Sequence, residues 1–293
     1  MRNRRAVSLL GIIGGSGLYD LPGLAGVRRQ RLTTPFGDPS DEIVTGFLDE
    51  QEIAFVSRHG AGHRFSPTEV PYRANLHALK QLGVTRVISV SAVGSMKEEI
   101  APGHMVLPAQ YIDRTVARPR TFFDDGIVAH VAFADPVCPQ LNEHMKGACF
   151  AAGATAHAGG TYLCIEGPQF STRAESELYR SWGVSVIGMT ALPEAKLARE
   201  AELCYATLAL ATDYDCWYAG HESVTVAQVI ETMRRNVTMA REVIRNAALG
   251  LSRLRDGACN CAHALDSAVM TAPQQISKAA RERLALLLGD RFR

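Results

Sequence analysis

Two acids, Asp213 and Asp215, directly follow the apolar run CYATLALAT, whose composition is that of a buried strand. In an extended chain residues i and i+2 point to the same side, so this spacing predicts two carboxylates that face one ligand. Two close carboxylates rarely both stay ionised, and a shared proton would let one of them act as a general acid. A turn with two solvated aspartates is the alternative that the same residues allow.

The segment GIIGGSGLYD, residues 11–20, sets an apolar run directly against Gly14, Gly15, Ser16 and Gly17. A strand that ends in glycines presents backbone N–H groups and lets an anion come close, so phosphate is the expected ligand. Neither the G-x-x-x-x-G-K-[ST] motif nor G-x-G-x-x-G is present, so a plain tight turn stays open.

Further donors for an oxyanion lie in SRHGAGHRFSP, which offers Arg58, His59 and His63 in a glycine-rich loop. A guanidinium supplies a planar fork of two donors, and the adjacent imidazole is expected to add a third. In SVSAVGSM, Ser89 and Ser91 end a strand where hydroxyls could complete a phosphate site. A solvated basic loop and the polar face of a strand are the alternatives.

The seven cysteines are scattered and odd in number, which does not indicate a secreted disulfide framework. Cys259 and Cys261 form a C-x-C that could be a strained disulfide, a metal ligand pair or two neighbours in a loop. A tetrahedral metal site needs two further ligands and only His263 is near, so metal is the weakest of the three readings. Cys138 and Cys204 are further candidate partners that the sequence cannot pair.

The elements that must position these residues alternate along the chain. Strand-like runs are LLGIIGG, IAFVSRHG, RVISVSAVGS, HMVLPAQYI, TYLCIEGP, VSVIGMT and CYATLALATDYD. Helical patterns are EVPYRANLHALKQLG, STRAESELYRSWG from Ser171 to Gly183, and LPEAKLAREA. The alternation predicts an α/β fold with a largely parallel central sheet.

The longest helix is predicted to begin near Val226, because Thr225 and Gln228 make a capping box. Periodicity is lost after Gly250 and returns in ISKAARERLALLLGDRFR. Without an internal repeat or linker, we expect one domain over residues 1–293, with a C-terminal loop and helix extension from about residue 251.

Composition narrows the class of partner. Of 293 residues 47% are apolar, and 31 Lys and Arg balance 30 Asp and Glu, so no global field favours nucleic acid or an anionic membrane. No apolar run approaches the roughly 20 residues that cross a bilayer, and MRNRRAVSLLGIIGG lacks a small-residue cleavage site. We therefore expect a cytoplasmic protein with a small-molecule partner.

Taken in order, GIIGGSGLYD, TPFGDPSD, SRHGAGH, VPYRANLHALK, SAVGS, IEGPQFSTRAES, GMTALPEAKLARE and ATDYDCW resemble the purine nucleoside phosphorylase superfamily, and within it the 5'-methylthioadenosine phosphorylase branch. The resemblance runs from about Gly11 to Leu251. It implies a single α/β domain with a central mixed, partly parallel sheet flanked by helices. It also implies a homo-oligomer, trimer or hexamer, and cleavage of a nucleoside by inorganic phosphate as co-substrate, with no cofactor and no metal.

The resemblance further implies roles for residues of this chain. The phosphate-binding residues would be Ser16, Arg58, His59, Ser91, Ala92 and Thr190, and the substrate-binding residues His63, Phe170, Met189, Val226, Val229, Ile230 and, from a neighbouring subunit, His130. Phe170 would stack on the base, the Met189 backbone would contact the ribose, and the apolar residues would read the 5' end. Animal members of the branch have Asn where this chain has Gly188.

The two acids would then select the base. Protonated Asp213 would donate to N7 and Asp215 would accept from the exocyclic amine, which favours a 6-aminopurine, whereas relatives that use 6-oxopurines carry Asn near this position. The expected reaction is conversion of methylthioadenosine to adenine and 5-methylthioribose 1-phosphate. A phosphorylase of broader purine specificity, acting on adenosine, inosine, guanosine or methylthioinosine, is the alternative, and a non-catalytic nucleoside-binding protein of the same fold is a second.

Overall fold

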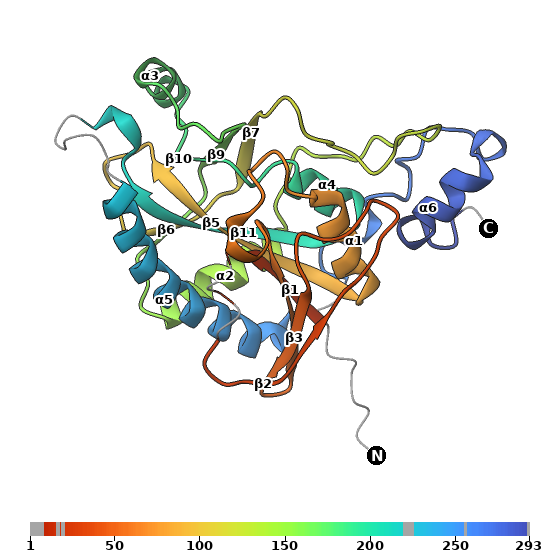
Figure 1. Ribbon diagram of the computed structural model, residues 1–293, viewed down its shortest axis with the longest axis horizontal. Coiled ribbons are helices and arrows are strands. Elements are labelled where there is room, and N and C mark those ends of the chain that lie inside the picture. The colour runs from red at the N-terminus through yellow and green to blue at the C-terminus, as the bar shows by residue number, and fades with distance from the viewer. Residues whose placement is uncertain (1–8, 16–17, 19–20, 219–225, 255–256, 292–293) are drawn as a thin grey trace.

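The computed structural model describes the chain except residues 1–8, 16–17, 19–20, 219–225, 255–256 and 292–293, and the side chains of 226–229 are likewise outside the description. One mixed sheet organises the described residues (Figure 1). Its strands are β1(Leu9–Gly14), β2(Leu24–Gln30), β3(Ile43–Leu48), β4(Gln51–Ser57), β5(Val84–Ser95), β6(Met105–Leu107), β7(Gln110–Arg114), β8(Ala156–Ala158), β9(Thr161–Ile165), β10(Val186–Gly188) and β11(Cys204–Asp213). The expected α/β fold with a mixed, partly parallel sheet is confirmed.

The middle of the sheet is parallel. β1 pairs with β4 on one side and β5 on the other, and β11 pairs with the far edge of β5. The carboxyl ends of these four strands therefore lie at one edge of the sheet. β2 and β3 extend the sheet antiparallel beyond β4, while β10, paired antiparallel to the end of β5, leads on to β9 and β7.

Helices cover both faces of the sheet. They are α1(Tyr72–Gln81), α2(Pro139–Ala151), α3(Arg173–Ser181), α4(Glu194–Glu200), α5(Val226–Gly250) and α6(Lys278–Leu288). Figure 1 shows α1 and α4 on one side of the central strands and α2 and α5 on the other. No helix in the described part of the chain has the length and apolar character needed to span a bilayer.

The side chains of β1 show why helices must cover both faces of the sheet. Leu9 and Ile13 pack in the cluster that contains α1 and α4, whereas Leu10 and Ile12 pack in the cluster that contains α2 and α5. Side chains alternate between the two faces of a strand, so a continuous apolar run is buried only when both faces are covered. This accounts for the run LLGIIG in the sequence.

The predicted helices α1, α4, α5 and α6 are present, and α5 begins at Val226 as expected, although Thr225 lies outside the described residues. The predicted start of α3 at Ser171 is wrong by one residue. Thr172 is the N-cap and forms a capping box with Glu175. Ser171 is not available for this role because its hydroxyl donates to Asp215.

The C-terminal segment after α5 returns to the body of the protein. Leu284 and Leu287 of α6 belong to the same apolar cluster as α1 and α4. An isolated bridge joins Ala129 to Val269, and the His130 N–H donates to the carbonyl of Ala268 at 2.8 Å. In Figure 1 α6 lies at the end of the molecule opposite α3.

Candidate active site

The polar residues predicted from sequence gather at the carboxyl edge of the parallel strands. Gly14 ends β1, Arg58 follows β4, Ser91 lies in the last part of β5, and Asp213 ends β11. The backbone N–H of Arg58 donates to the Gly14 carbonyl at 2.9 Å, which fixes the loop after β4 beside the glycine turn. Because these strands are parallel, they end at the same edge of the sheet, and residues up to 199 positions apart in the chain come together there.

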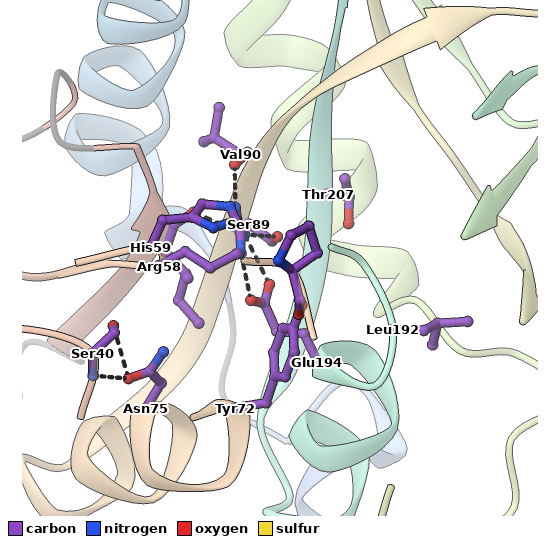
Figure 2. A network of polar contacts seen from close by, with 12 residues as sticks. Ser40, Arg58, His59, Tyr72, Asn75, Ser89, Val90, Leu192, Glu194 and Thr207 are labelled. Atoms are coloured by element: carbon purple, nitrogen blue, oxygen red, sulfur yellow. Dashed lines mark hydrogen bonds and ion pairs between the residues drawn. The ribbon is translucent and has the colours of Figure 1, made fainter. Parts of the chain in front are cut away.

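Arg58 is buried against a carboxylate that the sequence did not reveal (Figure 2). Its Nε donates to Glu194 at 2.9 Å and its Nη2 at 3.1 Å, and both side chains are at most 2% exposed. Burial disfavours the charged guanidinium, but the attraction and hydrogen bonds of Glu194 outweigh it and raise the pKa of Arg58. The guanidinium therefore remains a fixed positive charge at the strand ends.

The expectation that Arg58 offers a free two-donor fork is wrong. The fork is used on Glu194, one Nη1 hydrogen is donated to the Val90 carbonyl, and Nη2 also donates to Ser89. Among the described residues these bonds leave at most one N–H, on Nη1, for a ligand. Glu194 heads α4, and no local pattern in the sequence links it to Arg58.

His59 lies beside Arg58 with its tautomer set by the backbone. Nδ1 is 2.8 Å from the Phe65 carbonyl, and because a carbonyl can only accept, Nδ1 carries the proton. Burial first, and then the Arg58 charge, lower the pKa of His59 to about 4. The neutral ring presents the Nε2 lone pair, so His59 is an acceptor at neutral pH and not the third donor that the sequence suggested.

Three buried hydroxyls at this edge have no hydrogen-bond partner among the described residues: those of Ser91, Thr190 and Tyr162. Ser91 and Thr190 are each 7% exposed and Tyr162 is completely buried. Buried polar groups are nearly always hydrogen-bonded, so three orphans at one site indicate a ligand rich in acceptors or donors. Ser91 and Thr190 were predicted here, but Tyr162 was not.

Tyr162 explains the glycine at position 188. A Cβ added at Gly188 would meet the Tyr162 hydroxyl oxygen at 2.1 Å. Burial raises the pKa of Tyr162 to about 12, so the phenol stays protonated. The Ser91 hydroxyl and the Thr190 backbone lie close enough to oppose that rise, but neither forms a hydrogen bond of standard geometry with the Tyr162 hydroxyl. The signal that could have found it is its place in β9, where Tyr162 shares register with Val186 of β10, two residues before Gly188.

Asp213 is half-buried at the end of β11. Its Oδ2 accepts from the Thr212 hydroxyl and its Oδ1 from the Asp215 N–H, both at 2.7 Å. Burial, aided by the charge of Asp215, raises its pKa in spite of these hydrogen bonds. A Cβ at Gly94 would lie 3.1 Å from Asp213 Oδ1, so the glycine allows the strand β5 to pass close to the carboxyl group.

The extended backbone from which the common direction of Asp213 and Asp215 was predicted does not continue to Asp215. The strand ends at Asp213, and Asp215 begins a short 3-10 turn with φ +53°, so the i, i+2 rule does not apply. The carboxylate of Asp215 accepts hydrogen bonds from Ser171, at 3.0 Å to Oδ2, and from buried Ser176 of α3. No local pattern in the sequence indicates these two serines as partners.

Arg118, which the sequence analysis also missed, holds the loop that carries Met189. Its buried guanidinium donates to the carbonyl of Met189 at 2.7 Å and to that of Leu192 at 2.6 Å, and it pairs with Glu166 at 3.2 Å. Burial opposes charge on Glu166, but hydrogen bonds from Thr68 and the backbone lower its pKa to about 2. Glu166 thus positions the loop.

The remaining predicted residues lie at the surface or outside the description. Phe170 is 75% exposed and Ile230 49% exposed, while Ala92 and His130 are also exposed. His63 is exposed and stacks on His59, with ring centroids 4.2 Å apart. Ser16 and the side chains of Val226 and Val229 lie outside the described residues.

Comparison with known proteins places this chain among phosphorylases. The profile of the phosphorylase superfamily matches residues 9–248. The S-methyl-5'-thioadenosine phosphorylase of Geobacter sulfurreducens is 58% identical over 283 residues, which are 96% of this chain and 98% of the relative. That of Koribacter versatilis is 54% identical, over 97% of this chain and 96% of the relative.

Solved structures agree. A methylthioadenosine phosphorylase from an antarctic soil metagenomic library superposes with a TM-score of 0.91 at 48% identity, covering 97% of this chain and 100% of that one. The methylthioadenosine phosphorylase of Schistosoma mansoni in complex with adenine gives a TM-score of 0.80 at 37% identity, over 85% of this chain and 93% of that one.

Proposed function

This chain belongs to the phosphorylase superfamily, and from that membership we infer that it catalyses the phosphorolysis of S-methyl-5'-thioadenosine to adenine and 5-methylthioribose 1-phosphate. It is a pentosyltransferase: the N-glycosidic bond to adenine breaks and a C–O bond to phosphate forms. Inorganic phosphate is the co-substrate, and we propose that no cofactor or metal takes part in the reaction.

The observation that carries the assignment of the site is the group of three unpartnered hydroxyls beside Arg58. Phosphate offers four oxygens, and the hydroxyls of Ser91, Thr190 and Tyr162 can all donate to them. Arg58 adds a buried positive charge whose orientation Glu194 fixes. The glycine turn after β1, Ser16 and the Ala92 backbone complete the proposed phosphate site.

His59 supports the same assignment through its acceptor nitrogen. Monoprotonated and diprotonated phosphate both carry a P–OH group, which can donate to the Nε2 lone pair of His59. With the P–OH held there, the unprotonated oxygens face the hydroxyl donors. An unprotonated oxygen is then the one presented to C1' of the sugar.

Departure of adenine needs a proton donor, because the leaving base would otherwise carry the electron pair of the broken bond as a charge. Asp213 fits this role, since burial raises its pKa and so favours the protonated form. It would donate to N7. Asp215, held by Ser171 and Ser176, would accept from the exocyclic amine and so select a 6-aminopurine.

The sugar and base are held by residues at the rim. The carbonyl of Met189, fixed by Arg118, lies where the ribose contact is proposed, and Thr190 would bridge phosphate and ribose. Phe170 would stack on the base, and His63 with Val226, Val229 and Ile230 would contact the 5' substituent. Burying one thioether there contributes on the order of 1 to 2 kcal/mol, so selectivity over adenosine is expected to be modest.

The exposed positions of Phe170 and His130 favour a homo-oligomer, trimer or hexamer, in which His130 reaches a neighbouring pocket. We further propose a cytoplasmic location, and no nucleic-acid or membrane partner, in keeping with the even balance of charge.

The test is a product assay with methylthioadenosine, adenosine, methylthioinosine and inosine, each with and without phosphate. We expect adenine and a pentose 1-phosphate from methylthioadenosine, strictly dependent on phosphate, and little cleavage of either 6-oxopurine nucleoside. Faster cleavage of methylthioinosine or inosine would overturn the base assignment. Binding of methylthioadenosine without turnover would overturn the enzyme itself.

A further inference from the structure

Four cysteines from three separate segments of the chain meet at one point. They are Cys138, Cys204, Cys259 and Cys261, and their sulfur atoms all lie within 4.8 Å of one another. Cys138 precedes α2, Cys204 starts β11, and the other two belong to the segment after α5, in and next to the short 3-10 helix η5(Asn260–His263). The expectation that the C-x-C lacks two further ligands is therefore wrong.

The backbone holds these sulfurs in place. The N–H of Cys138 donates to the carbonyl of Tyr205 at 2.9 Å, which fixes the start of α2 against the residue that follows Cys204. Cys138 is 1% exposed and Cys261 4% exposed, while Cys204 and Cys259 are half-buried. His263, the nearby residue that the sequence offered as a ligand, is outside the group and pairs with Asp266 at 3.0 Å.

The spacing of the sulfurs is that of ligands around one ion. A Zn–S bond of about 2.3 Å in a tetrahedron puts ligand sulfurs about 3.8 Å apart. The sulfurs of Cys204 and Cys259 are 3.4 Å apart, close to that edge and well beyond the about 2.05 Å of a disulfide bond. The other sulfur pairs also lie within 4.8 Å, a separation compatible with ligands of a single ion.

We propose that Cys138, Cys204, Cys259 and Cys261 bind one Zn²⁺ as a closed, four-thiolate structural site. Soft thiolate ligands in tetrahedral arrangement select zinc or iron–sulfur centres, and sulfurs this close together fit a single ion. Four protein ligands leave no position for water or substrate, which distinguishes a structural zinc from a catalytic one.

The position of the site also assigns it a structural role. Cys204 begins β11 and Asp213 ends it, and a ten-residue strand places the two about 30 Å apart. The zinc would instead join the segment after α5 to the sheet and to α2. Downstream of the cysteines the same segment pairs with residues 128–130, through Ala268, Val269 and Met270, so the ion would also support that loop.

The experiment measures metal and thiols in the untagged full-length protein, purified without chelator and passed over metal-free buffer. We expect about one zinc per chain by elemental analysis, and all seven cysteines titrating as thiols after denaturation with a chelator. Cobalt substitution should give the visible absorption of a tetrahedral thiolate site. A thiol count below seven without reductant, which indicates disulfides, or a zinc content near zero would overturn the proposal.

Variants locate the ion. Cys259→Ser should lose most of the zinc and lower the thermal midpoint, whereas Cys149→Ser, on α2 but outside the group, should retain about one zinc per chain. Since neither cysteine lies at the active site, methylthioadenosine kinetics at low temperature provide a check of folding in both. If Cys259→Ser does not fold, chelation of the wild-type protein gives the same comparison: it should remove zinc and lower the midpoint. Full zinc retention in Cys259→Ser would contradict the assignment.

Discussion

The guanidinium of Arg58 donates two hydrogen bonds to the carboxylate of Glu194, a residue 136 positions further along the chain. Both side chains are buried, so this pair is a fixed internal charge distribution and not a surface contact. It gives the proposed phosphate site a positive group that cannot rotate.

Replacing Glu194 by Gln should impair both stability and phosphate binding. The amide keeps one acceptor but sets a donor against the second N–H of Arg58, and breaking a buried pair costs about 3 kcal/mol or more. We expect a large decrease in the free energy of unfolding, measured with urea, and a raised KM for phosphate. The control is Glu42→Gln, which breaks the exposed pair with Arg31 and should cost less than about 1 kcal/mol.

Tyr162→Phe should weaken phosphate binding with little effect on the stability of the protein. Since the hydroxyl has no partner among the described residues, its removal should change the free energy of unfolding by less than about 0.5 kcal/mol. If the Tyr162 hydroxyl donates to phosphate, the variant loses a hydrogen bond to a charged group. Such a bond contributes about 1.5 kcal/mol, so its loss should raise the KM for phosphate about tenfold. Tyr111→Phe should lower the free energy of unfolding and leave the KM for phosphate unchanged, because the Tyr111 hydroxyl is hydrogen-bonded to Thr207 at 2.8 Å. An unchanged KM in Tyr162→Phe would contradict its place in the site.

Asp213→Asn should lower kcat/KM by about 100- to 10,000-fold, since the amide cannot transfer a proton to N7. In the wild type the active form is protonated, so kcat/KM should fall as the pH rises through the raised pKa of Asp213. The variant should lack this dependence. A pH profile of the same shape in both proteins would exclude Asp213 as the acid.

The same substitution should not destabilise the protein at neutral pH. The pKa of Asp213 is raised on folding, so the folded state binds the extra proton and stability falls as the pH rises from the unfolded value through the folded one. An asparagine at position 213 does not ionise, so the variant does not lose stability in this pH range. We therefore expect the thermal midpoint of Asp213→Asn to equal or exceed that of the wild type at pH 7 to 8, in contrast to its activity.

Asp215→Asn should move the substrate preference toward inosine. A carboxylate can only accept a hydrogen bond from the amine of adenine, whereas an amide can also donate to O6 of hypoxanthine. We expect the ratio of kcat/KM for inosine to that for adenosine to rise at least about tenfold. Glu175→Gln, a change of an exposed acid on α3 that bonds to Thr172, should leave the ratio unaltered.

The apolar runs and helical patterns of the chain were enough to predict its architecture. Runs such as LLGIIG, apolar at every position, require burial on both faces of a strand, and their alternation with helical patterns leads to a parallel centre with helices on each side. The sequence also indicated the edge at which Arg58, Ser91 and Asp213 meet, because residues that follow parallel strands share one end of the sheet. Helix starts were less certain, as Ser171 and Thr172 show, since a neighbouring group can take the hydroxyl that would cap the helix.

The hydrogen-bond partner of each polar group, in contrast, followed from how distant segments pack together. The carboxylate of Glu194 occupies the fork of Arg58, the Phe65 carbonyl makes His59 an acceptor, and a 3-10 turn begins at Asp215 where an extended strand was expected. Ser176 and the two remote cysteines likewise found their partners through contacts between distant segments, and Tyr162 came to lie beside Gly188 in the same way. Residue type and local spacing fix the hydrogen-bonding capacity of a side chain, but which atom meets which depends on the packing of segments far apart in the chain.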